Sequence, residues 1–162
     1  MPCSRKACAE QPFHLFAAPK HGCRPCSEIP VNLIHTPVSL GELADKITIL
    51  QIKAERITQP ERVAHVRTEL DGLLPLWADA IAGTPELEAV KDELKTINAR
   101  MWDIQDGLRE REKTGTFDDE FIRLARAVMT TNAARVKLKN DINHRAGSAF
   151  IEEKQYKAEP GN

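Results

Sequence analysis

The chain has 162 residues, of which 41% are hydrophobic and 5% aromatic, and its 23 Lys and Arg nearly balance its 24 Asp and Glu. This balance lacks the basic excess of electrostatic nucleic-acid binders, and no apolar run approaches the length of a membrane span. We therefore expect neither a nucleic-acid nor a membrane partner. A cytoplasmic location is also expected, because the N-terminus lacks the apolar core of a signal peptide.

The first 37 residues differ in composition from the rest of the chain. They contain six prolines, which remove backbone donors and fix φ, so we expect a disordered extension. All four cysteines lie here, spaced as Cys3-x4-Cys8 and Cys23-x2-Cys26. Two such pairs could close a zinc site, but the first spacing is loose and a proline interrupts the second, so no metal is predicted. A start codon chosen too far upstream would also produce such a segment.

One folded domain is expected over residues 38–157, followed by a frayed tail at 158–162. Ser39 and Glu42 form a capping box, which predicts a helix beginning at Leu40. Apolar residues recur at steps of three and four from Leu40 to Ile57, so this helix should be amphipathic and about five turns long.

A second helix should begin at Pro60, because proline suits the first helical position and Thr58 offers a cap. Its apolar line ends at Trp77. Gly72 and Pro75 fall within that line and predict a kink or a break.

A helical hairpin is predicted from Thr84, as the cap of a third helix, to about Tyr156. The third helix carries apolar residues at strict 3-4 spacing, which turns one face toward a partner helix. Gly115 ends it, Thr116 or Asp118 caps the fourth helix, and that helix continues to about Arg145. The segment 148–156 keeps three bulky apolar residues and should fold back. The predicted fold is all-α: an antiparallel bundle of four main helices with a folded-back C-terminal segment and a disordered N-terminal extension.

The apolar seam of the fourth helix is interrupted by polar residues. Thr131, Asn132 and Arg135 occupy positions that continue the inward-facing line, which resumes at Leu138. Polar residues at helical spacing lie beside the seams of both arms, and antiparallel packing would let them face one another. This set, the polar stripe, consists of Asn98, Trp102, Asp106, Arg109, Asn132, Arg135, Lys139 and Asn143.

Two interpretations of the polar stripe follow from the cost of burying an unpaired charge. In the structural one, Asp106 pairs with Arg135 or Arg109, and the asparagines fix the register of the helices. In the other, Arg135 and Lys139 bind a small carboxylate or phosphate, as a ligand-binding protein or an enzyme would. No catalytic residue is assigned and no cofactor is expected.

A metal-dependent alternative rests on two acid pairs at i,i+3. Glu42 with Asp45, and Asp103 with Asp106, could each present two carboxylates to Mg²⁺ for pyrophosphate cleavage. Such enzymes need a denser acidic cluster than this sequence contains. Pairs at this spacing are also common on solvated helix faces.

Several motifs resemble a bacterial family of short proteins known only as a domain of unknown function. They include Ser39-Leu-Gly-Glu-Leu-x-Asp-Lys-Ile-Thr-Ile-Leu50, Trp102-Asp-Ile104, Thr131-Asn132 and Glu152-Glu-Lys-x-Tyr156. The resemblance covers about residues 38–156 and implies no established activity; Gln105 stands where an acid would be expected. We therefore predict a non-catalytic binding or interaction module, with a homo-oligomer or another protein as partner, and small-anion binding as the alternative.

Overall fold

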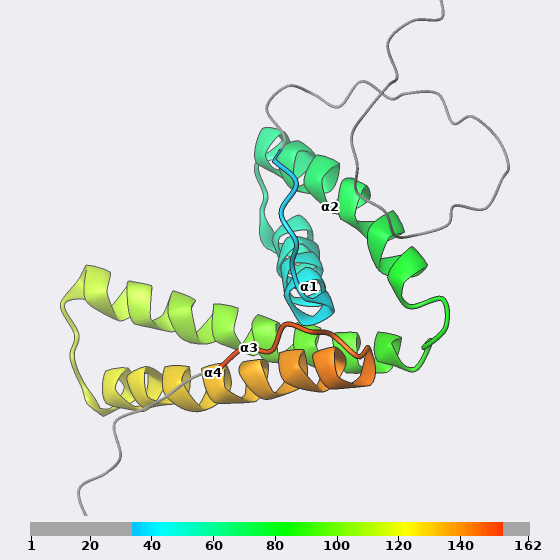
Figure 1. The fold of residues 1–162 in the computed structure, drawn as a ribbon. Helices are drawn as coiled ribbons and strands as arrows, with labels where there is room; N and C mark the ends of the chain where they lie inside the picture. The colour runs from blue at the N-terminus through cyan, green and yellow to red at the C-terminus, as the bar shows by residue number, and fades with distance from the viewer. Residues whose placement is uncertain (1–33, 154–162) are drawn as a thin grey trace, which may run out of the picture. The chain divides into compact units, whose positions relative to one another are not determined.

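The computed structural model describes residues 34–153 (Figure 1). Four helices fill this range: α1 (Leu40–Arg56), α2 (Pro60–Ala80), α3 (Leu87–Thr114) and α4 (Asp119–Arg145). The predicted all-α fold with four main helices is confirmed. The expectations for the cysteines and for Tyr156 concern residues outside the described range. None of the described helices is both long and apolar enough to cross a membrane.

Two of the predicted helix starts are confirmed in detail. The Ser39 hydroxyl accepts a hydrogen bond from the Glu42 amide at 3.2 Å, and Asp118 Oδ1 accepts one from the Phe121 amide at 3.0 Å. Each satisfies an amide that has no partner within the first helical turn. Gly115 ends α3 with a φ of 65°, a left-handed conformation that glycine adopts without steric cost.

Two local predictions are wrong. The N-cap residue of α2 is Gln59, not Thr58, and that of α3 is Glu86, not Thr84; neither makes a side-chain capping bond. The Thr84 carbonyl instead accepts from the Leu87 amide in a turn before α3. Of the kink or break predicted near residues 72–75, the break is absent, since the helix continues through Pro75. Pro75 is exposed, so water can satisfy the carbonyl that loses its helical partner.

The helices form two hairpins, α1–α2 and α3–α4, and α1 lies across the α3–α4 pair (Figure 1). α2 packs against α1, and Trp77 near its end donates a hydrogen bond to Glu88 of α3 at 2.7 Å. The half of the α3–α4 hairpin that contains the loop between these two helices projects beyond α1 (Figure 1). The core lies where all four helices meet and contains Ala44, Ile47, Trp77, Leu87, Val90, Leu94 and Ile142.

The predicted return of the C-terminal segment is confirmed as far as residue 153. Gly147 adopts a φ of 65°, and the Ser148 amide donates to the Asn143 carbonyl at 2.9 Å, which closes α4. The chain then runs back along α4 (Figure 1), where Glu152 contacts Lys139 and Asn140. The segment thereby reaches the polar side of α4.

Candidate functional site

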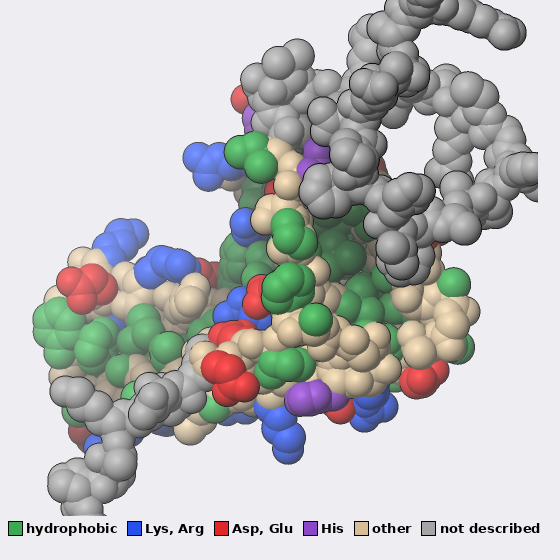
Figure 2. All heavy atoms as spheres, in the orientation of Figure 1, with side chains coloured by type: hydrophobic (Ala, Val, Ile, Leu, Met, Phe, Trp, Pro, Cys, Tyr) green, Lys and Arg blue, Asp and Glu red, His purple; other side chains and the backbone are tan. Residues whose placement is uncertain are grey.

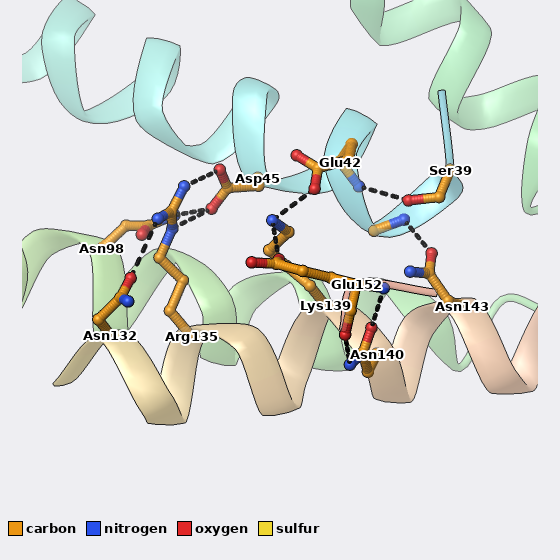
Figure 3. A network of polar contacts seen from close by, with 11 residues as sticks. Ser39, Glu42, Asp45, Asn98, Asn132, Arg135, Lys139, Asn140, Asn143 and Glu152 are labelled. Carbon is orange, nitrogen blue, oxygen red and sulfur yellow. Dashed lines mark hydrogen bonds and ion pairs between the residues drawn. The ribbon is translucent and has the colours of Figure 1, made fainter. Parts of the chain in front are cut away.

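A carboxylate on α1 is one of two deeply buried charges of the polar stripe region. Asp45 is 4% exposed and accepts two hydrogen bonds from the Arg135 guanidinium, Nε to Oδ1 at 2.7 Å and Nη2 to Oδ2 at 2.5 Å (Figure 3). Asn98 Nδ2 donates to Asp45 Oδ1 and to Thr48 Oγ1, both at 3.0 Å. The hydrogen bonds to Asp45 raise the pKa of Arg135 above its ordinary value. One buried carboxylate thus joins α1, α3 and α4.

Lys139 lies next along α4, and its ammonium is equally enclosed. The residue is 4% exposed, and Nζ lies 2.6 Å from Glu42 Oε1 on α1 and 2.6 Å from Glu152 Oε2 in the C-terminal segment (Figure 3). Burial alone would lower the pKa of Lys139, but the hydrogen bonds to Glu152 and Glu42 outweigh it and raise that pKa. Stabilisation from this charge is therefore complete below about pH 10 and is lost only as the pH rises through the folded-state pKa.

Asn143 closes the other end of the network at the start of α1. Its Oδ1 accepts a hydrogen bond from the Gly41 amide at 2.7 Å, so a side chain of α4 satisfies a first-turn amide of α1. A Cβ on Gly41 would lie 2.4 Å from the Lys139 carbonyl oxygen and 2.8 Å from Asn143 Oδ1. The close approach of α1 to α4 therefore requires glycine here.

Replacing Gly41 with alanine should lower the free energy of unfolding by about 1–3 kcal/mol, because the new methyl group would push against the α4 backbone. Chemical denaturation measures this change. Gly72→Ala is the matched control: a Cβ there meets no atom within 4 Å, and helix propensity should stabilise the protein by about 0.5–1 kcal/mol. A Gly41→Ala protein as stable as the wild type would contradict the close packing.

The structure divides the predicted polar stripe into two groups. Asn98, Asn132, Arg135, Lys139 and Asn143 come together beneath α1, with Asn132 Oδ1 accepting from Arg135 Nη1 at 3.4 Å. The remaining three lie outside this network.

The predicted pairing of Asp106 with Arg135 is wrong, whereas its pairing with Arg109 is confirmed at 2.7 Å, on the exposed side of α3. The Arg56 guanidinium carbon lies over the Trp102 ring, 5.8 Å from the centroid of the ring. Arg135 pairs with Asp45 instead because α1 covers α4 at that level. The polar network is hereafter Gly41, Glu42, Asp45, Thr48, Asn98, Asn132, Arg135, Lys139, Asn140, Asn143 and Glu152.

Sequence reasoning missed the α1 members of the network. Gly41, Asp45 and Thr48 follow one another at steps of four and three, so they share one side of α1 beside its apolar face. The signal that could have identified them is an aspartate flanked at helical spacing by two small residues, a glycine and a threonine, next to the apolar face. Asn140 and Glu152 carry no such signal, because their contact depends on the return of the chain after Gly147.

The four carboxylates of the magnesium hypothesis are each paired with a cation. Glu42 and Asp45 hold Lys139 and Arg135, while Asp103 pairs with Arg56 and Asp106 with Arg109. Within residues 34–153, no group of His, Cys, Asp or Glu is arranged to hold a metal ion. The acid pairs therefore give no support to metal-dependent chemistry.

Two open grooves run between α3 and α4, with volumes of about 600 Å³ and about 930 Å³. The first is lined by residues of the projecting half of the hairpin, such as Asp103, Gly107 and Arg123, and the second by residues such as Ile97, Leu138 and Asp141. None of the eight predicted stripe residues lines either groove. The polar network fills the space under α1 with its own side chains.

Comparison with known protein families identifies the family of this chain. A model described as a family of unknown function, DUF6165, matches residues 34–160. The chain belongs to the DUF6165 family. The predicted resemblance to an uncharacterised family is confirmed at this level, and the DUF6165 match contains every residue of the polar network. Searches among curated proteins and among solved structures found no match.

Proposed function

We propose that this DUF6165 protein is a non-catalytic interaction module that associates with a second copy of itself through the outer face of α4. This face consists of Ile122, Ala125, Met129, Ala133 and Val136, at steps of 3, 4, 4 and 3. Met129 is 69% exposed and Ile122 is 47% exposed. Figure 2 shows hydrophobic side chains exposed over the projecting part of α3 and α4. Large apolar groups left in water favour association.

The single observation that carries the proposal is the symmetry of this face about Met129. Ile122 and Val136 lie seven residues on either side of Met129, and Ala125 and Ala133 lie four residues on either side. Two α4 helices packed antiparallel about a two-fold axis would place Ile122 of one copy near Val136 of the other. The alanines would leave room for the large side chains, as a self-complementary interface requires.

Charges beside the outer face of α4 support the same arrangement. Asp119 and Lys137 lie on one side of this face, both are exposed, and neither makes an ion pair with a described residue. Asp119 precedes Met129 by ten residues and Lys137 follows it by eight. Antiparallel pairing about Met129 therefore brings Lys137 of one copy to within two residues of the level of Asp119 of the other, where opposite charges favour this register.

The oligomeric state measured by light scattering over a range of concentrations tests the proposal. The wild type should form a dimer, and Met129→Lys should shift it to the monomer. Leu76→Lys is the matched control, because Leu76 is equally an exposed apolar residue of a helix but lies on α2. Asp119→Lys should weaken the dimer and Asp119→Lys with Lys137→Glu should restore it. A monomeric wild type, or a dimer indifferent to Met129→Lys, would refute the proposal.

The non-catalytic part of the proposal is supported by the closure of the polar network. The two cations suited to an anion, Arg135 and Lys139, already face carboxylates of α1 and the C-terminal segment. Binding of a small anion is the second candidate, favoured by the convergence of both cations on one network. We also include a bacterial source and a cytoplasmic location in the proposal, and cell fractionation would test the location.

A further inference from the structure

Two neighbouring residues of α4, Lys139 and Asn140, both bind Glu152 of the returning C-terminal segment. Asn140 Nδ2 donates to the Glu152 carbonyl oxygen at 2.9 Å, and Asn140 Oδ1 accepts from the Glu152 amide at 3.1 Å (Figure 3). Lys139 Nζ meets the carboxylate of the same residue at 2.6 Å. One side chain therefore binds the main chain of residue 152, and the next binds its side chain.

Among the described residues 149–153, Glu152 alone makes hydrogen bonds to α4. Residues 148–153 have no helical or strand hydrogen bonding, and the Ser148 hydroxyl bonds only locally, to the amide and carbonyl of Phe150. Phe150 is exposed, and Glu153 is exposed directly beside the half-buried Glu152. The polar attachment of the segment is therefore concentrated at residue 152, next to the half-buried Ile151.

The contacts of Lys139 and Asn140 with Glu152 have the features of a peptide-recognition site. A side-chain amide that both donates to and accepts from one residue's main chain reproduces a rung of strand pairing, which binds any extended peptide. The Lys139 ammonium adds selectivity, because it has several donors and a glutamate at this position gives it a second carboxylate acceptor beside Glu42. The raised pKa of Lys139 agrees with a charge that remains in place.

We infer that Lys139 and Asn140 form a binding site for an extended peptide that carries a glutamate, and that the chain's own Glu152 occupies it as a tethered ligand. A tether of a few residues after α4 gives the chain's own segment a high effective concentration, so a peptide in trans competes only when the tether is cut. The same segment of a second copy has the required chemistry. The inference uses neither the outer face of α4 nor its proposed dimer.

The test starts from the full chain with a protease site inserted between Gly147 and Ser148, in the exposed turn, and a fluorophore at the C-terminus. After cleavage of the folded protein, fluorescence anisotropy should show the labelled segment still bound. An unlabelled peptide of residues 148–157 should displace it. A peptide with Glu152→Gln should displace the segment only at a concentration at least roughly tenfold higher, because it loses a charge-assisted hydrogen bond. The control peptide with Glu153→Gln should compete like the wild type.

Protein variants provide the reciprocal measurement. Asn140→Ala and Lys139→Met should release the labelled segment on cleavage. In the uncut wild-type protein, no added peptide should displace the tethered segment. The peptide variants decide the question even if Lys139→Met does not fold, because they leave the receptor unchanged. Loss of the labelled segment on cleavage of the wild type would overturn the inference. So would equal weakening by Glu152→Gln and Glu153→Gln.

Discussion

Replacing Arg135 with methionine should lower the free energy of unfolding by about 3 kcal/mol, the low end of the range for breaking a buried ion pair. Methionine keeps most of the length of the side chain but leaves the Asp45 carboxylate buried without a cation. The loss stays at the low end because the Arg135 side chain is 27% exposed and Asn98 still donates to Asp45. Urea denaturation of the two proteins measures the difference.

A second substitution identifies the partner of Arg135. Arg135→Met with Asp45→Asn should recover a large part of the loss, because no charge then remains buried, and a double-mutant cycle should show strong coupling. Asp106→Asn serves as the control: this exposed carboxylate contacts Arg109, so it should neither change stability measurably nor couple to Arg135. Coupling to Asp106 in place of Asp45 would contradict the network.

The same proteins also separate the two candidate functions. If Arg135 bound a small anion, phosphate or acetate would raise the melting temperature of the wild type but not of Arg135→Met. We expect no anion-specific rise in either protein, because Asp45 already occupies the guanidinium.

Replacing Leu94 with alanine should lower the free energy of unfolding by about 2–5 kcal/mol, because the change leaves a cavity where the helices meet. Leu94 is fully buried within the core cluster. Ile97→Ala is the matched control on the same helix. Ile97 is half-buried and lines the larger groove, so its truncation should cost only about 1 kcal/mol. Equal losses at the two positions would show that α3 is rotated relative to the described packing.

Periodicity predicted the faces of the helices but not which helix covers each face. The 3-4 spacing of α3 places Leu94 and Ile97 on one seam, yet only Leu94 lies beneath α1 and α2 as well as α4. The inward position of Arg135 followed from its register with Val128 and Ile142. Its partner did not, because Asp45 lies 90 residues away, on a helix whose crossing point no local pattern records. Asp106 lies on the exposed side of α3, where it pairs with Arg109.

Helix-capping hydrogen bonds were more predictable where only one or two polar residues, such as Ser39 for α1 and Thr116 or Asp118 for α4, could serve as the cap. Ser39 and Asp118 are the polar residues directly before their helices, and both cap them. Before α2 and α3 the sequence offers several compatible starts, and proline fixes the backbone there without needing a capping side chain. The error at Thr84 arose in this way.

The 90-residue separation of Asp45 and Arg135 has a consequence for synthesis of the protein. A ribosome adds about 5–20 residues per second, so roughly 5–20 seconds pass between the two residues. During this interval α1 and α2 have emerged, but α4, which supplies Arg135, Lys139 and Asn143, has not. The nascent chain must keep Asp45 in water and the apolar side of α1 uncovered until α4 has been synthesised. Completion of the fold is thereby tied to the synthesis of α4, and a product truncated before α4 would carry an unfinished core for chaperones and proteases to recognise.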